Sequence, residues 1–158
     1  MVSTPELALV GLLLGVQLLE TILDRLNLRY GAAAVRDAAE WVRSALDVDD
    51  PEAMLAYQRS KTVLSQTQSW IGVLAVLAVV VSGLYGEVVT ALNGTGLPTA
   101  AQGVVLFAGA VLAGRVLSAP FDAYETFVVE ERFGFNNQTP TLWLRDLVVG
   151  TVVALALG

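Results

Sequence analysis

Residues 119–139 read APFDAYETFVVEERFGFNNQT, and they carry more structural information than any other part of the chain. The segment lies between two apolar runs, yet it holds four carboxylates and five aromatic residues. Four of the aromatic residues recur at near-helical spacing: Tyr124, Phe127, Phe133 and Phe135. This spacing predicts that the preceding helix continues beyond its apolar run with one buried face. Gly134 then allows a backbone turn that a side chain would block.

The composition indicates a membrane protein. The chain has 158 residues, of which 55% are hydrophobic, and its mean hydropathy is +0.65. Soluble domains are usually about 45–50% apolar, and here the excess is gathered in runs, as in membrane spans. The net charge of −6 gives no basic surface for a nucleic-acid partner. The chain has no cysteine and no histidine, so disulfides, thiolate catalysis and the commonest zinc ligand are all absent from it.

Apolar runs predict an all-α fold, a polytopic membrane bundle of helices. Three runs read as full spans, at about residues 7–23, 70–89 and 100–117. A fourth span is expected at 142–158, where the last apolar run, Leu147–Leu157, is shorter than the about 20 residues that a helix needs to cross hydrocarbon. We therefore expect three full spans and a truncated fourth in a single membrane domain.

The polar segment 24–69 is expected to form cytoplasmic amphipathic helices. Apolar residues recur at helical spacing in its first half: Val35, Ala38, Ala39, Val42 and Leu46. Asp47–Asp50 breaks this helix, and Asp50 followed by Pro51 has the pattern of an N-cap and a first helical residue. From Pro51 nothing interrupts a helix before the second span.

Turn signals separate the remaining elements. The cluster Asn93–Pro98 predicts a turn between the second and third spans. Pro120 is expected to end the third span, and Thr139 followed by Pro140 to start the last helix. We treat residues 119–141 as a loop and call them the signature segment.

The distribution of cations orients the spans. Six of them lie in the polar segment: Arg25, Arg29, Arg36, Arg43, Arg59 and Lys61. The turn at 86–99 has none, whereas Arg132 lies in the signature segment. The positive-inside rule therefore predicts an N-terminus outside, with segment 24–69 and the signature segment in the cytoplasm.

Ten residues of the signature segment form a long ungapped pattern: Pro120, Tyr124, Thr126, Phe127, Glu130, Glu131, Gly134, Phe135, Asn136 and Thr139. In this pattern the chain resembles the type I CAAX prenyl proteases, which are integral-membrane zinc metalloendopeptidases. A shorter likeness is the helix carrying Tyr57 and Lys61. The resemblance covers the family's non-catalytic N-terminal membrane portion. It implies an integral membrane protein, in the cell membrane if the source is prokaryotic, whose helices help to enclose and position a peptide substrate.

The resemblance also implies what this chain lacks. Zinc and the His-Glu-x-x-His helix are expected in a downstream part of the parent protein, so this chain alone should be inactive. The implied partners are the lipid bilayer, the downstream catalytic domain and a peptide or membrane-protein substrate. An alternative is a stand-alone, non-catalytic membrane scaffold or interaction protein derived from such a protease.

The polar side chains of the signature segment have two interpretations. In one, Glu130 and Glu131 pair with cations in the downstream part, and in the other they are solvated surface acids. Asn136 and Thr139 can satisfy loop and helix-start amides. No metal site is expected here, because acids spread along one helical stretch do not converge.

Two charged residues lie inside apolar runs, at matching depths. Glu20 and Arg115 each stand about one turn from the cytoplasmic end of their spans, and buried charges in lipid usually have a partner. We expect a Glu20–Arg115 ion pair, with Gln17 as a hydrogen-bond neighbour. The alternative is that both side chains snorkel to the interface.

Small residues recur at four-residue spacing in two spans, at Gly11 and Gly15, and at Gly109 and Ala113. Such patterns let helices approach closely. They serve packing within the chain or, alternatively, a homodimer.

Overall fold

The structure is a computed structural model that describes residues 4–46 and 50–157. Within these ranges it contains helices and no strand. The elements are α1 (Thr4–Asp37), α2 (Ala39–Leu46), α3 (Pro51–Ser82), α4 (Leu84–Asn93), α5 (Thr99–Tyr124), the π-helix η1 (Glu125–Glu130), α6 (Glu131–Phe133) and α7 (Pro140–Leu157). Four of the described helical stretches are long and apolar enough to cross a membrane. The predicted all-α membrane bundle is confirmed.

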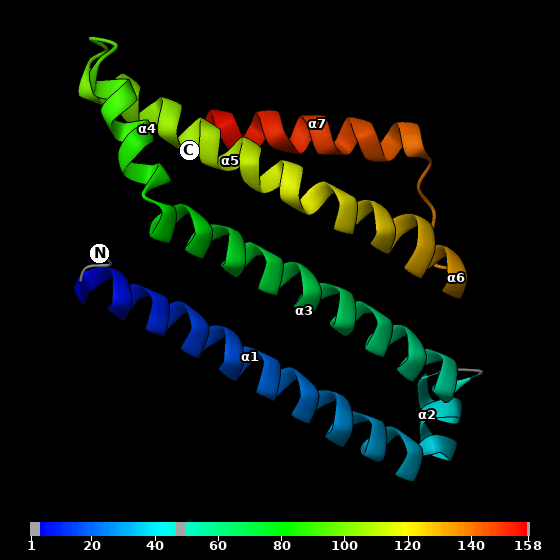
Figure 1. Cartoon of the computed structure of the whole chain (residues 1–158). Coiled ribbons are helices and arrows are strands. Elements are labelled where there is room, and N and C mark those ends of the chain that lie inside the picture. The colour runs from blue at the N-terminus through cyan, green and yellow to red at the C-terminus, as the bar shows by residue number, and fades with distance from the viewer. Residues whose placement is uncertain (1–3, 47–49, 158) are drawn as a thin grey trace.

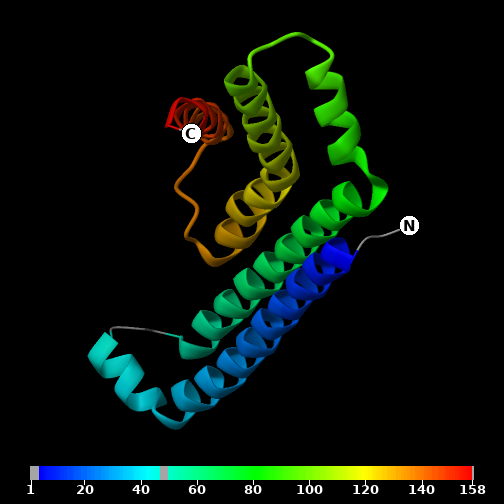
Figure 2. The same cartoon turned by 90° about the vertical axis from the view of Figure 1, so that its left-hand side faces the viewer.

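The long helices lie in a row. In Figure 1, α3 runs between α1 on one side and α5 on the other, and α7 packs along α5. Figure 2 shows the same order from the side, with α1 and α3 close together and α4 turned away from α3. The helix α2 folds back at the end of α1 that is remote from the N-terminus. The signature segment therefore emerges beside the first half of α3.

Helices α1 and α3 are joined by polar side chains at the membrane end of their contact. Gln17, only 3% exposed, accepts a hydrogen bond from Ser69 Oγ at 2.8 Å. Trp70 Nε1 donates to Thr21 Oγ1 at 3.0 Å, and Gln66 Nε2 donates to Asp24 at 3.2 Å. Because lipid tails are as apolar as leucine, such interhelical hydrogen bonds hold helices together where a hydrophobic drive is missing. They fix an antiparallel register between α1 and α3.

The helix starts that the sequence predicted are present. Asp50 has an extended backbone, and its carboxylate accepts hydrogen bonds from the backbone amides of Glu52 and Ala53. Pro51 is the first residue of α3, where its missing N–H costs nothing. The expected break at Asp47–Asp50 falls largely on residues 47–49, which lie outside the described ranges.

Gly83 divides the range 70–89 that the sequence marked as the second span. Its φ of 78° ends α3 at Ser82, and its N–H donates to the Val80 carbonyl at 3.3 Å. Helix α4 then begins at Leu84 in a new direction (Figure 2). Glycine reaches this left-handed conformation without the Cβ strain of other residues. The second apolar run is therefore two helices.

Two expectations about the last third of the chain need correction. Pro120 lies inside α5 and does not end it, and the helical path continues through η1 and α6 to Phe133. The signature segment is consequently helical over most of its length, with a turn only at residues 134–139. One missing N–H weakens a single turn, whereas contacts with α3 hold the helix beyond it.

The fourth apolar helix, α7, begins at Pro140 and has 18 residues, so it too is a candidate span.

Candidate functional site: the signature segment on helix α3

Lys61 of α3 links two acids of the signature segment. Its Nζ lies 2.6 Å from Glu125 Oε1 and 3.9 Å from Glu130 Oε1. All three side chains are partly shielded, at 39%, 33% and 27% exposure. Glu125 and Glu130 are the first and last residues of η1, so the ammonium of Lys61 contacts residues at both ends of the π-helix. One α3 cation thus lies near two carboxylates and reduces the repulsion between them.

Tyr57 adds an aromatic contact one turn before Lys61. Its ring packs edge-on against Phe133, with centroids 5.4 Å apart, and in a tilted arrangement against Phe135, with centroids 4.8 Å apart. Lys61 Nζ also lies 5.5 Å from the centre of the Tyr57 ring, within cation–π range. Because Tyr57 and Lys61 are four residues apart, they share one face of α3. That face of α3 contacts η1, α6 and the start of the turn that follows α6.

The turn after α6 is shaped by its own side chains. Gly134 has a φ of 76°, and its N–H donates to the Glu131 carbonyl at 3.2 Å. Asn136 donates to Glu131 Oε2 at 2.9 Å and accepts from the Gln138 amide at 2.7 Å. Thr139 Oγ1 accepts from the Leu142 amide at 3.3 Å, which caps α7. Asn136 and Thr139 therefore bind backbone amides in the way that the sequence suggested.

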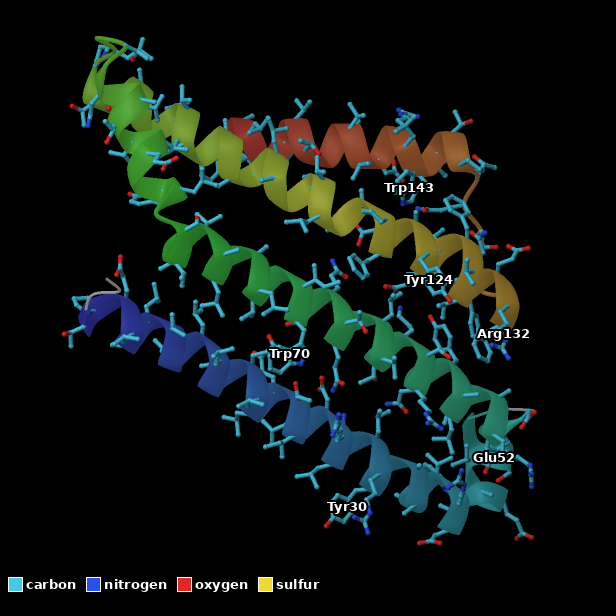
Figure 3. All side chains as sticks on the ribbon, viewed as in Figure 1. Tyr30, Glu52, Trp70, Tyr124, Arg132 and Trp143 are labelled. Atoms are coloured by element: carbon cyan, nitrogen blue, oxygen red, sulfur yellow. The ribbon has the colours of Figure 1, made fainter. Side chains whose placement is uncertain are left out.

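Phe127 connects the signature segment to α7. Its ring meets Trp143 edge-on at 6.1 Å (Figure 3 shows Trp143 on the α5 side of α7). Val129, 6% exposed, is one of three buried apolar residues among those whose exposure is described. The segment is consequently held on two sides, by α3 through Tyr57 and Lys61 and by α7 through Phe127.

A cavity of about 340 Å³ lies between the signature segment and α3. Tyr124 and Arg132 line it from the signature segment, and Arg59 and Thr67 line it from α3. Figure 3 places Tyr124 and Arg132 on the side of this helical stretch that faces α3. Of the other signature residues, Thr126 is half-buried and Pro120 is exposed.

The structure does not bring Glu20 and Arg115 together. Among the described residues the two form no ion pair with each other: the ion pairs join Arg36 with Glu52 and Lys61 with Glu125 and Glu130. The guanidinium of Arg115 lies against α7, 3.6 Å from where a Cβ on Gly150 would stand. Helix α3 lies between α1 and α5 (Figure 1), which explains the separation.

Sequence reasoning missed how Glu130 is used. The two interpretations placed its partner in another part of the protein or in solvent, whereas the structure gives it Lys61 of the same chain. Glu131 is exposed and accepts from Asn136. The four-residue spacing of Tyr57 and Lys61 could have indicated this pairing, because it places an aromatic ring and a cation on one face of α3, and the signature segment offers aromatic and acidic side chains.

The donor set within the described residues does not form a metal centre. No group of three or more His, Cys, Asp or Glu residues is placed to hold a metal ion in residues 4–46 and 50–157. Glu125 and Glu130 share Lys61, Asp122 accepts a hydrogen bond from Ser118, and Glu131 accepts one from Asn136. These contacts can hold the signature segment in one position at the end of the helical bundle.

These features define a helical membrane domain in which the signature segment is held between α3 and α7. The family model for the CAAX prenyl protease N-terminal domain, described as five membrane helices, matches residues 32–158. This chain belongs to that family. It is an integral membrane protein.

Curated relatives match over short segments. The CAAX prenyl protease 1 homolog of Arabidopsis thaliana is 41% identical over 51 residues, 32% of this chain and 12% of the relative. The homolog of Oryza sativa subsp. japonica is 36% identical over 55 residues, 35% of this chain and 13% of the relative. CAAX prenyl protease 1 of Saccharomyces cerevisiae is 40% identical over 43 residues, 27% of this chain and 10% of the relative. The matched segment is thus a small part of each of these relatives. No solved structure matches the chain.

Proposed function

We propose that this chain is the N-terminal, non-catalytic membrane portion of a zinc metalloendopeptidase similar to the CAAX prenyl proteases. Its helices help to enclose and position a peptide substrate near the cytoplasmic face of the membrane. The observation that carries this proposal is the clamp that Tyr57 and Lys61 form on the signature segment. A clamped segment offers a downstream catalytic domain a rigid surface, and rigid supports position substrates more accurately than mobile loops.

Zinc does not fit the residues of this chain. A catalytic zinc takes His, Cys, Asp or Glu ligands with an open position for water. The chain has no His or Cys, and the signature carboxylates contact Lys61, Ser118 and Asn136. We therefore assign no catalytic step to this chain and place zinc in a downstream part of the parent protein. The partners proposed with it are that catalytic domain and a peptide or membrane-protein substrate.

The proposed orientation places the N-terminus outside and the signature segment in the cytoplasm. Arg25, Arg29 and Arg59 lie toward the same end of the bundle as Lys61, while the turn between α4 and α5 has no cation. The positive-inside rule favours this arrangement.

The first test reads the source gene past the codon for Gly158. A frame that continues to a His-Glu-x-x-His helix supports the protease portion. A stop codon directly after Gly158, with stable membrane insertion of the short protein, supports the alternative of a stand-alone scaffold derived from such a protease.

The second test changes the clamp in the gene product that contains this chain. Tyr57→Ala removes the ring between Phe133 and Phe135, so the signature segment loses its fixed position. We expect KM for a CAAX-type peptide to rise by about tenfold, with a smaller change in kcat, because substrate positioning is weakened while the zinc chemistry is untouched.

The matched control is Tyr30→Ala, since Tyr30 is 70% exposed and points away from α3 in Figure 3. It should leave both constants unchanged. Equal effects of the two substitutions, or unchanged kinetics of Tyr57→Ala, would refute a role of the clamp in substrate positioning.

A further inference from the structure

A larger groove runs between α1 and α3, and it shares Arg59, Ser60, Val63 and Thr67 of α3 with the cavity beside the signature segment. Its volume is about 1020 Å³. Leu55, Val63 and Ile71 of α3 contribute apolar lining, and Leu55 is only 9% exposed. Trp70, whose ring lies between α1 and α3 in Figure 3, lines its membrane end. The groove therefore combines an apolar lining with an end at the level of the first and second spans.

The groove gathers cations in an acidic chain. The net charge is −6, yet four of the nine Lys and Arg residues line this one groove: Arg25, Arg29, Arg36 and Arg59. Glu52 is the only acid in the lining, and it forms two hydrogen bonds with Arg36 at 2.8 and 3.1 Å. The nearby Asp24 accepts from Gln66. Among the described residues, the other three groove arginines have no ion-pair partner.

The register of the two helices sets Arg29 and Arg59 at similar depths. Thr21 meets Trp70 at one end of the groove, and Arg36 meets Glu52 at the other. Arg29 and Arg59 each lie about midway between those contacts, so they stand level on opposite walls. At 1.5 Å per residue, Arg29 is about 9 Å beyond the apolar run that ends at Leu23. Each headgroup layer of a bilayer is about 5–8 Å deep, so Arg25, about 3 Å beyond the run, lies within that layer and Arg29 lies at its outer edge.

We propose that this groove binds the headgroup of an anionic phospholipid. Guanidinium groups hold phosphate oxygens in pairs through parallel hydrogen bonds. Basic pockets between membrane helices at the interface are the usual form of such lipid sites. Arg29 and Arg59 hold the phosphate from opposite walls, Arg25 adds charge on the membrane side, and Val63 and Ile71, on the membrane side of Arg59, receive the acyl chains. The proposal does not rest on the protease role, although Arg59 also lines the cavity beside the signature segment.

The test uses the full chain, purified in a neutral detergent, and native mass spectrometry to resolve bound lipids. Phosphatidylglycerol, phosphatidylcholine and inorganic phosphate are titrated separately. We expect phosphatidylglycerol to bind about tenfold more tightly than phosphatidylcholine, and the double variant Arg29→Gln/Arg59→Gln to lose that preference, since each interfacial arginine adds about a factor of five. Inorganic phosphate should bind far more weakly than the lipid.

The matched control is Arg43→Gln/Arg145→Gln, which makes the same charge change on α2 and α7, outside the groove. It should retain the preference, and Arg29→Lys/Arg59→Lys should retain part of it. Circular dichroism of each variant checks that helix content is kept. Equal binding of the two lipids, an equal loss in the control, or phosphate binding as tight as lipid binding would overturn the proposal.

Discussion

At the scale of single residues, Lys61 is the centre of the clamp. It touches the two ends of η1 and lies over the Tyr57 ring, so one side chain joins two helices that are far apart in sequence. Exposed ion pairs contribute little to stability, but this pair is about two-thirds shielded, at 39% and 33% exposure. Shielding reduces screening by water and salt, so the interaction should be measurable.

We predict a coupling of about 0.5–1 kcal/mol between Lys61 and Glu125, after allowing for solvent screening of the exposed third of each side chain. A double-mutant cycle of Lys61→Gln and Glu125→Gln measures it from thermal unfolding in detergent. The same cycle with Glu131→Gln serves as the control, because Glu131 contacts Asn136 and no contact joins it to Lys61. Equal coupling in both cycles would show that the ion pair has no specific role.

The helical continuation of the signature segment could be predicted from the sequence, but the residues that its side chains contact could not. The aromatic spacing from Tyr124 onward indicated a continued helix with a buried face, and the structure has that helix. The partner face on α3 could not be derived, because a pairing 60 or more residues apart in the chain depends on how whole helices cross. The same reason explains Glu20 and Arg115: equal depth in two spans does not make the spans neighbours, and α3 lies between them.

At the scale of helices, boundaries set by local chemistry were predictable. The caps at Asp50 and Thr139 follow from an oxygen side chain before a proline, and each accepts backbone hydrogen bonds. Helix boundaries that depend on the packing around a residue were not predictable. Gly83 interrupts an apolar run that reads as continuous, whereas Pro120 fails to interrupt one. Glycine and proline are both common in membrane helices, so their effect depends on the packing around them.

Gly134 is the helix end on which the clamp depends. Its φ of 76° lies in the left-handed region, although a Cβ there would meet no atom within 4 Å. We predict that Gly134→Ala lowers the free energy of unfolding by about 1 kcal/mol through backbone strain alone. The measurement is the midpoint of thermal unfolding in detergent.

Two further variants separate strain from volume at Gly134. Gly134→Asn should recover part of the loss, because asparagine tolerates the left-handed region better than alanine. Gly86→Ala is the matched control: a Cβ there also meets no atom within 4 Å, its φ is not positive, and alanine favours a helix. A loss of stability in Gly86→Ala equal to that in Gly134→Ala would contradict the explanation by strain.

At the scale of the whole molecule, the bilayer replaces a hydrophobic core. Among the residues whose exposure is described, the buried hydrophobic residues are Val42, Leu55 and Val129, while long rows of Leu and Val are exposed. In water such a surface would drive aggregation, but facing lipid it needs no protein partner. The helices are instead tied by polar contacts, at Gln17 and Trp70 between α1 and α3, and at Lys61 between α3 and η1.

The orientation of this bundle can be tested directly, because the chain has no cysteine of its own. Leu97→Cys lies in the turn between α4 and α5, and Asn137→Cys lies in the turn before α7, with the span of α5 between them. We predict that a membrane-impermeant maleimide labels Leu97→Cys in intact cells and Asn137→Cys only after lysis, because the positive-inside rule favours a cytoplasmic position for the cation-rich end of the bundle. Val76→Cys, within the span of α3, should stay unlabelled in both conditions. The reverse pattern would invert the orientation, and labelling of both turns in intact cells would mean that α5 does not cross the membrane.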